Sequence, residues 1–123
     1  MQSWKQISWD CLQAAQMLRD KHPRSCISRA YYAAFSAGVW LYWRQQGKPK
    51  AGDRETPSHK ALPGLIARGL PGRPGKDARR ELRYLYGARL VADYRTSAGI
   101  DPDSREAGKA LQKAAAVMRL CGV

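Results

Sequence analysis

The segment of residues 24–46 constrains the fold more than any other, because it carries apolar side chains on two sides of one helix. A helix that is apolar on two sides lies at the centre of a bundle, or packs a core on one side and a partner subunit on the other. Gly47 is the expected stop. One face holds Ile27, Ala30, Tyr31, Ala34, Gly38, Leu41 and Tyr42, and the other holds Tyr32, Phe35, Val39 and Trp43.

Helical periodicity recurs in nearly every segment that is not rich in Pro or Gly, and strand signals are absent. We expect an all-α, antiparallel up-and-down bundle of about five helices that forms a single domain over residues 1–123. The expected helices are about residues 4–20, 24–46, 58–68 with Ser58 as N-cap, 77–94, and a last one ending near Leu120. Asp101 and Pro102 supply the N-cap and first position of that last helix. Loops are expected at residues 48–57, 69–75 and 96–103.

A cation and a carboxylate interrupt an apolar stripe near the end of the fourth expected helix. Leu82, Leu85, Tyr86, Arg89 and Asp93 fall on one face at helical spacing. Charges are almost never buried unpaired, so Arg89 and Asp93 either pair in the interior or line a cleft. Arg before Asp is the weaker order for a helical i,i+4 pair, which argues against a purely local role. We expect the pair to line an open cleft.

The formal net charge of +12 indicates a polyanionic partner, such as RNA, DNA, a nucleotide or an acidic protein. The alternative is that the basic residues only solvate the surface. Residues 44–95 carry 13 Lys and Arg against five Asp and Glu, so the charge is concentrated. The candidate nucleic-acid-binding residues are His59, Lys60, Arg79, Arg80, Arg83 and Arg95.

The sequence carries no signal for a membrane span, a signal peptide, a metal site or a cofactor site. No run of 18 apolar residues predicts a membrane span, and the first ten residues lack the order of a signal peptide. The three cysteines are scattered, which is typical of reduced thiols in the cytoplasm. No Cys or His spacing predicts a metal site, and no Gly-rich loop follows a strand, so we expect neither a metal nor a cofactor.

Three ring-bearing residues are further candidates. His59 follows the expected N-cap Ser58 and either packs locally or contacts a ligand, because its surroundings are basic. Tyr31 and Tyr32 diverge by about 100° on a helix, so they are not expected to serve one site. Both are expected to be core aromatics whose hydroxyls bond to polar partners.

Three motifs together resemble the HEPN superfamily, specifically its small stand-alone branch. Ser28-Arg-Ala-Tyr-Tyr-Ala-Ala-Phe35 is similar to the second-helix signature, and Ser58-His-Lys60 to the Thr/Ser-His that opens the next helix. Residues 85–94, which end Arg-x-x-Ala-Asp-Tyr, resemble the fourth-helix motif. Their order and spacing match over about residues 5–120.

The resemblance implies a helical bundle that dimerises around a polar cleft. Many such proteins are metal-independent ribonucleases with Arg followed by four to six residues and His on the fourth helix. There the His performs acid–base chemistry on a ribose 2′-OH and the Arg steadies phosphate charge. Arg89 matches that Arg, but Tyr94, Arg95 and Thr96 occupy the window of the His. Tyr, with a pKa near 10, is a poor general base. His59 substitutes only if the fold brings it to the cleft.

Two functions follow from the resemblance, and catalysis stays open in the first of them. Some members are toxins encoded beside a minimal nucleotidyltransferase that acts as antitoxin. The first function is an RNA-engaging component of a toxin–antitoxin or defence system, with Arg89 binding phosphate, Asp93 orienting Arg89 and Tyr94 contributing a hydroxyl. The second is a non-catalytic nucleotide-binding or protein-interaction module that partners such a nucleotidyltransferase. We expect a cytoplasmic homodimer that uses the second apolar face of residues 24–46 or the adjacent helices.

Overall fold

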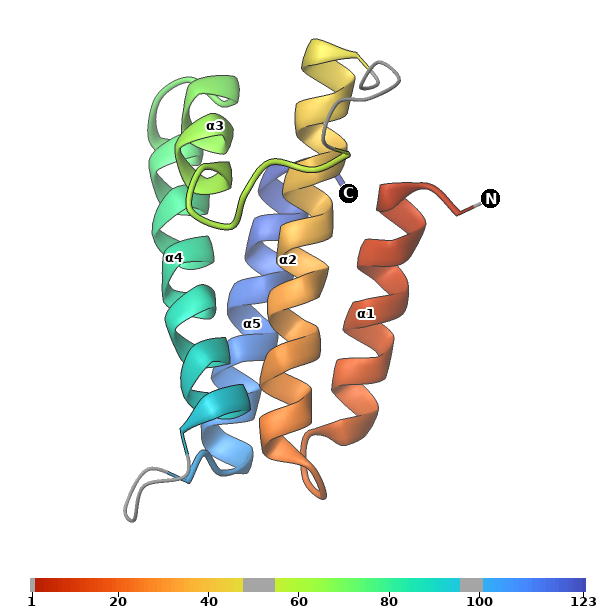
Figure 1. Cartoon of the computed structure of the whole chain (residues 1–123), viewed down its shortest axis with the longest axis vertical. Helices are drawn as coiled ribbons and strands as arrows, with labels where there is room; N and C mark the ends of the chain where they lie inside the picture. The colour runs from red at the N-terminus through yellow and green to blue at the C-terminus, as the bar shows by residue number, and fades with distance from the viewer. Residues whose placement is uncertain (1, 48–54, 96–100) are drawn as a thin grey trace.

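The computed structural model describes residues 2–47, 55–95 and 101–123. Within these ranges the chain forms five helices and no strand (Figure 1). The four long helices run alternately down and up, and the short α3 lies beside the end of α2 and the start of α4 (Figure 1). The predicted all-α bundle is confirmed. The helices are α1 (Trp4–Leu18), α2 (Pro23–Gln46), α3 (Leu62–Gly69), α4 (Arg73–Tyr94) and α5 (Ser104–Leu120).

Helix α2 lies at the centre of the bundle and packs against each of the other four helices. Small side chains such as Ala30 and Ala34, which are fully buried, allow these close approaches. On the second apolar face, Val39 is fully buried and Phe35 is 6 % exposed. The chain's own helices therefore cover the part of this face that we expected to meet a partner subunit. The homodimer stays a prediction, and the adjacent helices are the other interface that we expected for it.

Two helices, α3 and α4, begin four residues away from their expected starts, and in each case a proline explains the difference. Proline has no backbone N–H, so it fits only in the first turn of a helix. A helix starting at Ser58 would place Pro63 in its interior, whereas α3 starts at Leu62 and places Pro63 in its first turn. Likewise, α4 starts at Arg73 with Pro74 in its first turn, four residues before the predicted start.

Ser58 caps a turn before α3 rather than α3 itself. Its Oγ accepts a hydrogen bond from the backbone N–H of Ala61 at 3.1 Å, and its carbonyl accepts one from Leu62 at 3.0 Å. The N-cap of α5 is also displaced from the prediction. Asp103, not Asp101, accepts a hydrogen bond from the backbone N–H of Glu106 at 2.9 Å.

Some expectations concern residues outside the described ranges. Residues 48–54 of the expected loop 48–57, and residues 96–100 of the expected turn 96–103, are among them. Cys26 and Cys121 are buried as small core residues, and Cys11 is half-buried. None of the described helices is both long and apolar enough to cross a membrane.

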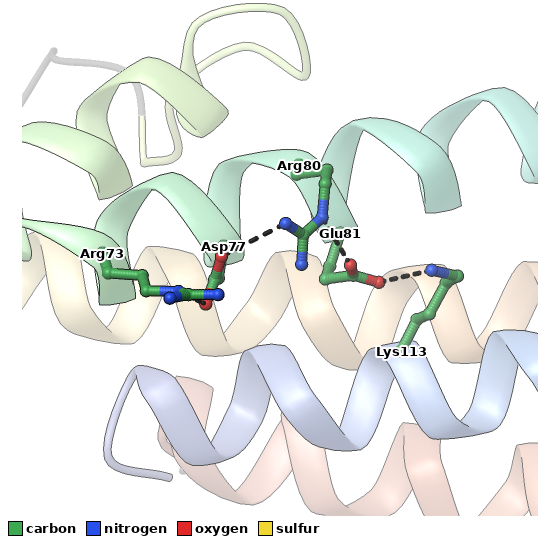
Figure 2. A network of polar contacts seen from close by, with 5 residues as sticks. All are labelled: Arg73, Asp77, Arg80, Glu81 and Lys113. Carbon is green, nitrogen blue, oxygen red and sulfur yellow. Dashed lines mark hydrogen bonds and ion pairs between the residues drawn. The ribbon is translucent and has the colours of Figure 1, made fainter.

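A network of ion pairs joins α4 to α5 on one side of the bundle (Figure 2). Glu81 has an 11 % exposed side chain that accepts from Lys113 of α5 at 2.7 Å and from Arg80 at 2.9 Å. Arg80 also pairs with Asp77 at 3.2 Å, and the exposed Arg73 approaches Asp77 at 3.9 Å. Burial by itself raises the pKa of Glu81, but the hydrogen bonds and charges of Lys113 and Arg80 outweigh burial and lower it.

Candidate functional site

The motifs on α2 and α4 meet at the carboxylate of Asp93. Arg89 donates from Nε to Oδ2 of Asp93 at 3.2 Å, and the Ser28 hydroxyl donates to the same oxygen at 3.2 Å. The Arg89 side chain is only 11 % exposed, whereas that of Asp93 is 27 % exposed. The pair is therefore less open than we expected, because α2 covers the arginine.

Four tyrosine rings surround the Arg89 guanidinium. Its central carbon lies 5.2 Å from the ring centre of Tyr32 and 5.5 Å from that of Tyr31. The rings of Tyr94 and Tyr86 follow at 5.9 and 6.0 Å. Ring faces carry negative charge density that attracts a cation, so the rings stabilise the charge where water is scarce.

The expectation that Tyr31 and Tyr32 cannot serve one site is wrong, because both rings contact Arg89 and their centres are only 5.3 Å apart. The two Cα–Cβ directions diverge, but the site lies between them. Ser28, Tyr31, Tyr32 and Phe35 are spaced as i, i+3, i+4 and i+7, so they share one face of α2. Ser28 and Phe35 lie at the middle of this face, between the directions of the two tyrosines. Long aromatic side chains on either side then reach the same point.

The guanidinium keeps unused hydrogen-bond donors. Nε is taken by Asp93, but no described residue accepts from either Nη atom. No described side-chain nitrogen or oxygen is both sealed from solvent and without a partner, so both Nη atoms reach solvent. Burial works against the charge, yet Tyr32, the hydrogen bond to Asp93 and Tyr94 outweigh burial and raise the pKa of Arg89. Arg89 is thus a cation that Asp93 and the tyrosine rings hold in place, and its two Nη groups remain free as donors.

The fold brings His59 to this site. Its Nδ1 lies 2.5 Å from the Tyr31 hydroxyl, and its ring stacks on that of Tyr86 at 5.7 Å with a 20° interplanar angle. His59 and Arg89 therefore contact the same three tyrosine rings, those of Tyr31, Tyr32 and Tyr86. Burial, and then the charge of Arg89, lower the pKa of His59 below its ordinary value of 6.5.

The tautomer of His59 follows from its partner. Burial raises the pKa of Tyr31 far above its ordinary value, despite the lowering effect of Arg89, so Tyr31 keeps its proton. The Tyr31 hydroxyl is also fully buried and has no described partner besides Nδ1, so its proton has no other acceptor and it donates to Nδ1 of a neutral imidazole. The imidazole proton sits on Nε2, for which no described residue is an acceptor. Nε2–H is therefore a second free donor, beside the rings of Tyr31, Tyr32 and Tyr86.

A groove of about 310 Å³ opens beside these rings, between α1, α2 and the segment before α3. His59 and Tyr32 belong both to the groove and to the surroundings of Tyr31. Arg29 and Thr56 contribute polar groups to its lining, and Trp4 contributes a further ring. The described residues contain no group of three His, Cys, Asp or Glu side chains that could hold a metal ion.

A family model for the HEPN domain matches residues 1–123. The chain belongs to the HEPN family. Neither a curated protein nor a solved structure matches it significantly. In this HEPN domain, the α2 and α4 motifs are the two segments that contact each other at Asp93 and around the guanidinium of Arg89.

The predicted site residues of this HEPN domain fall into two groups, one around the Arg89–Asp93 pair and one elsewhere on α4. Tyr94 is 68 % exposed at the end of α4 and contacts Arg89 through its ring, and Arg95 follows it at the surface. Lys60 is exposed next to His59. These residues and the Arg89–Asp93 pair occupy one region that includes the end of α4 and the turn before α3.

The other three predicted basic residues lie elsewhere on α4. Arg79 lines a groove against α3. Arg80 is held by Asp77 and Glu81 in the ion-pair network (Figure 2). Arg83 lines an apolar pocket of about 480 Å³ next to α5. The six candidates therefore do not form one binding surface, because successive residues of α4 face different neighbours.

Sequence reasoning missed two members of the site. Ser28 hydrogen-bonds Asp93, and Tyr86 supplies a ring to both Arg89 and His59. The signal for Ser28 was present, since it lies one turn before Tyr31 and Tyr32 on the face that points between them. Tyr86 was placed on the stripe of Arg89, but nothing local indicated that a histidine from residue 59 would stack on it.

Proposed function

We propose that this HEPN domain engages RNA by binding a backbone phosphate at Arg89, as a component of a toxin–antitoxin or defence system. The observation that supports this is a largely buried guanidinium whose two Nη atoms have no acceptor among the described residues. A guanidinium offers paired donors that match two phosphate oxygens. In this proposal Asp93 orients Arg89, and the exposed hydroxyl of Tyr94 lies at the rim.

His59 adds a neutral donor to the same proposal. With its proton on Nε2 it can bind a phosphate oxygen or a ribose hydroxyl, but in this tautomer it cannot take a proton from a 2′-OH. Metal-independent cleavage of RNA needs such a base. The tautomer therefore favours binding of RNA without cleavage over a ribonuclease. Binding without cleavage is also what the second candidate function requires, a non-catalytic nucleotide-binding module that partners a nucleotidyltransferase.

A binding and cleavage experiment with purified protein tests the proposal. Wild type, Arg89→Lys and the control Arg105→Lys are titrated into labelled single-stranded RNA, and the same mixtures are followed for cleavage in EDTA. Lys keeps the charge but loses the paired donors, so Arg89→Lys should weaken binding about tenfold or more. Arg105 is an exposed residue of α5, so its substitution should leave affinity unchanged.

The outcomes separate the functions. Equal RNA affinity of Arg89→Lys and wild type would overturn the phosphate site. Binding without cleavage would favour the non-catalytic module, whereas cleavage that is lost in both Arg89→Lys and His59→Gln would establish a ribonuclease. Expression of the domain with and without a nucleotidyltransferase encoded beside it would test the toxin–antitoxin role, because a toxin slows growth only when expressed alone.

A further inference from the structure

A second cationic groove lies between α3 and the first turns of α4, away from the Arg89 site. It has a volume of about 510 Å³. Arg68 of α3 faces Lys76 and Arg79 of α4 across it. The rest of its lining consists of small residues, which leave the backbone accessible. These are Gly64, Ala67 and Gly72.

The three cations converge because the backbones of the two helices touch. A Cβ atom at Gly75 would collide with the carbonyl oxygens of Ala67 and Leu70, so only glycine permits this approach. Gln45 of α2 also donates to the carbonyl of Gly69 at 2.7 Å and holds the end of α3. The charges are therefore mounted on packed helices rather than on a loop.

No acidic side chain among the described residues neutralises Arg68, Lys76 or Arg79. Asp77, the acidic residue next in sequence to Lys76, pairs with Arg73 and Arg80 instead (Figure 2). An anion that enters the groove therefore meets three cationic side chains and no carboxylate that pairs with them.

The groove has the chemistry of a phosphate site rather than of a base site. None of its described lining residues is aromatic, so it offers no ring on which a base could stack. The N-terminus of the 22-residue α4 lies at Gly72, where no side chain caps it. The partial positive charge of this terminus adds to that of the three cations.

We propose that this groove binds backbone phosphates of a single-stranded RNA whose further phosphate occupies the Arg89 site. The inference rests on the proposed function. Arg79 and Arg89 lie ten residues apart on α4, which is about 15 Å along the helix axis at 1.5 Å per residue. At 100° per residue the two positions also lie about 80° apart around the helix, so an extended RNA that reaches both sites passes diagonally over α4. Arg68, Lys76 and Arg79 then set affinity and register without reading sequence.

Salt-dependent RNA binding tests the groove. The triple variant Arg68→Gln, Lys76→Gln, Arg79→Gln is compared with a control of equal net charge, Lys21→Gln, Arg105→Gln, Arg119→Gln, at exposed positions outside the groove. Each phosphate contact in single strands contributes about 0.7 to the slope of log affinity against log salt. The groove variant should bind more weakly with a slope about two units less steep, and the control should keep the wild-type slope. Melting temperatures confirm that both variants fold.

The groove and the Arg89 site can fail separately. If the groove variant keeps the wild-type slope while Arg89→Lys loses affinity, the groove proposal is overturned and the Arg89 site stands. If the groove variant loses two units of slope while Arg89→Lys binds normally, the groove stands and the Arg89 site is overturned. Equal losses in the groove variant and its control would reduce both effects to net charge and overturn the groove. Failure of the wild type to bind RNA at low salt would overturn both proposals.

Discussion

The hydroxyl of Tyr31 lies 2.5 Å from Nδ1 of His59, and this contact joins the centre of α2 to the turn before α3. Tyr31 is fully buried, so its hydroxyl needs a partner inside the protein. The imidazole in turn receives its orientation and tautomer from the tyrosine. The same tyrosine ring contacts the guanidinium of Arg89, so one buried side chain positions both free donors of the candidate site.

Substitution of Tyr31 by Phe should destabilise the protein by about 1–3 kcal/mol, because it leaves Nδ1 of a partly buried imidazole without its donor. The change is measured as the free energy of unfolding in urea. Tyr86→Phe is the matched control, since no described residue hydrogen-bonds the Tyr86 hydroxyl, and it should change stability by about 0.5 kcal/mol or less. Equal losses in the two variants would contradict a role for the hydrogen bond.

The stability of the wild type should fall through His59 as the pH drops below about 6.5. Its pKa is lowered in the folded protein, so the unfolded chain takes up the proton at higher pH. Stability from this group is therefore complete above about pH 6.5 and is lost as the pH falls through the folded pKa. His59→Gln should show a flatter dependence of melting temperature on pH in this window. Parallel curves for the two proteins would argue against the shift.

Loss of Lys113 should leave Oε2 of Glu81 without a partner in the interface between α4 and α5, while Arg80 still pairs with Oε1 (Figure 2). We expect Lys113→Met to cost about 1–3 kcal/mol at neutral pH. The pKa of Glu81 is lowered in the fold, so this contribution is present above about pH 4.5 and disappears as the pH falls through the folded pKa.

Arg73→Met provides the control for that substitution, because the Arg73 side chain is 91 % exposed and its Nε lies as far as 3.9 Å from Oδ2 of Asp77. Its effect should stay below about 1 kcal/mol. The double variant Lys113→Met, Glu81→Leu should recover part of the lost stability, since it removes the stranded charge. A Lys113→Met protein as stable as the wild type at pH 7 would show that Arg80 alone satisfies Glu81.

Two glycine substitutions should have opposite signs. A Cβ at Gly38 of α2 would lie 2.6 Å from Cδ1 of Ile66 and 3.0 Å from Cδ2 of Leu62, so Gly38→Ala should push α3 away and cost about 1–3 kcal/mol. A Cβ at Gly87 of α4 would meet nothing within 4 Å. Gly87→Ala should therefore stabilise by about 0.5–1 kcal/mol through helix propensity. Thermal unfolding of both variants measures the difference, and a common sign would contradict the packing at Gly38.

Local patterns were sufficient for the fold class and for one contact of the site. Apolar periodicity predicted three of the five helices to within two residues at each end, and the C-terminal ends of α3 and α4 equally well, because a 3.6-residue period needs no distant partner. The contact of Arg89 with Asp93 follows from their i,i+4 spacing on one helix. The starts of α3 and α4 were also encoded locally, in Pro63 and Pro74, although we expected these helices to begin at residues 58 and 77.

The chain sequence by itself thus determined an all-α bundle, an α2 that is apolar on two sides and a charged pair on α4, since helical periodicity and i,i+4 neighbours are properties of short segments. Only the tertiary structure decided that His59 meets Tyr31, 28 residues away in sequence, and that Glu81 takes Arg80 and Lys113 while Arg79 stays unpaired. Those outcomes depend on which helix faces are brought together. Packing of the whole core makes that choice, and the residues of one segment do not encode it.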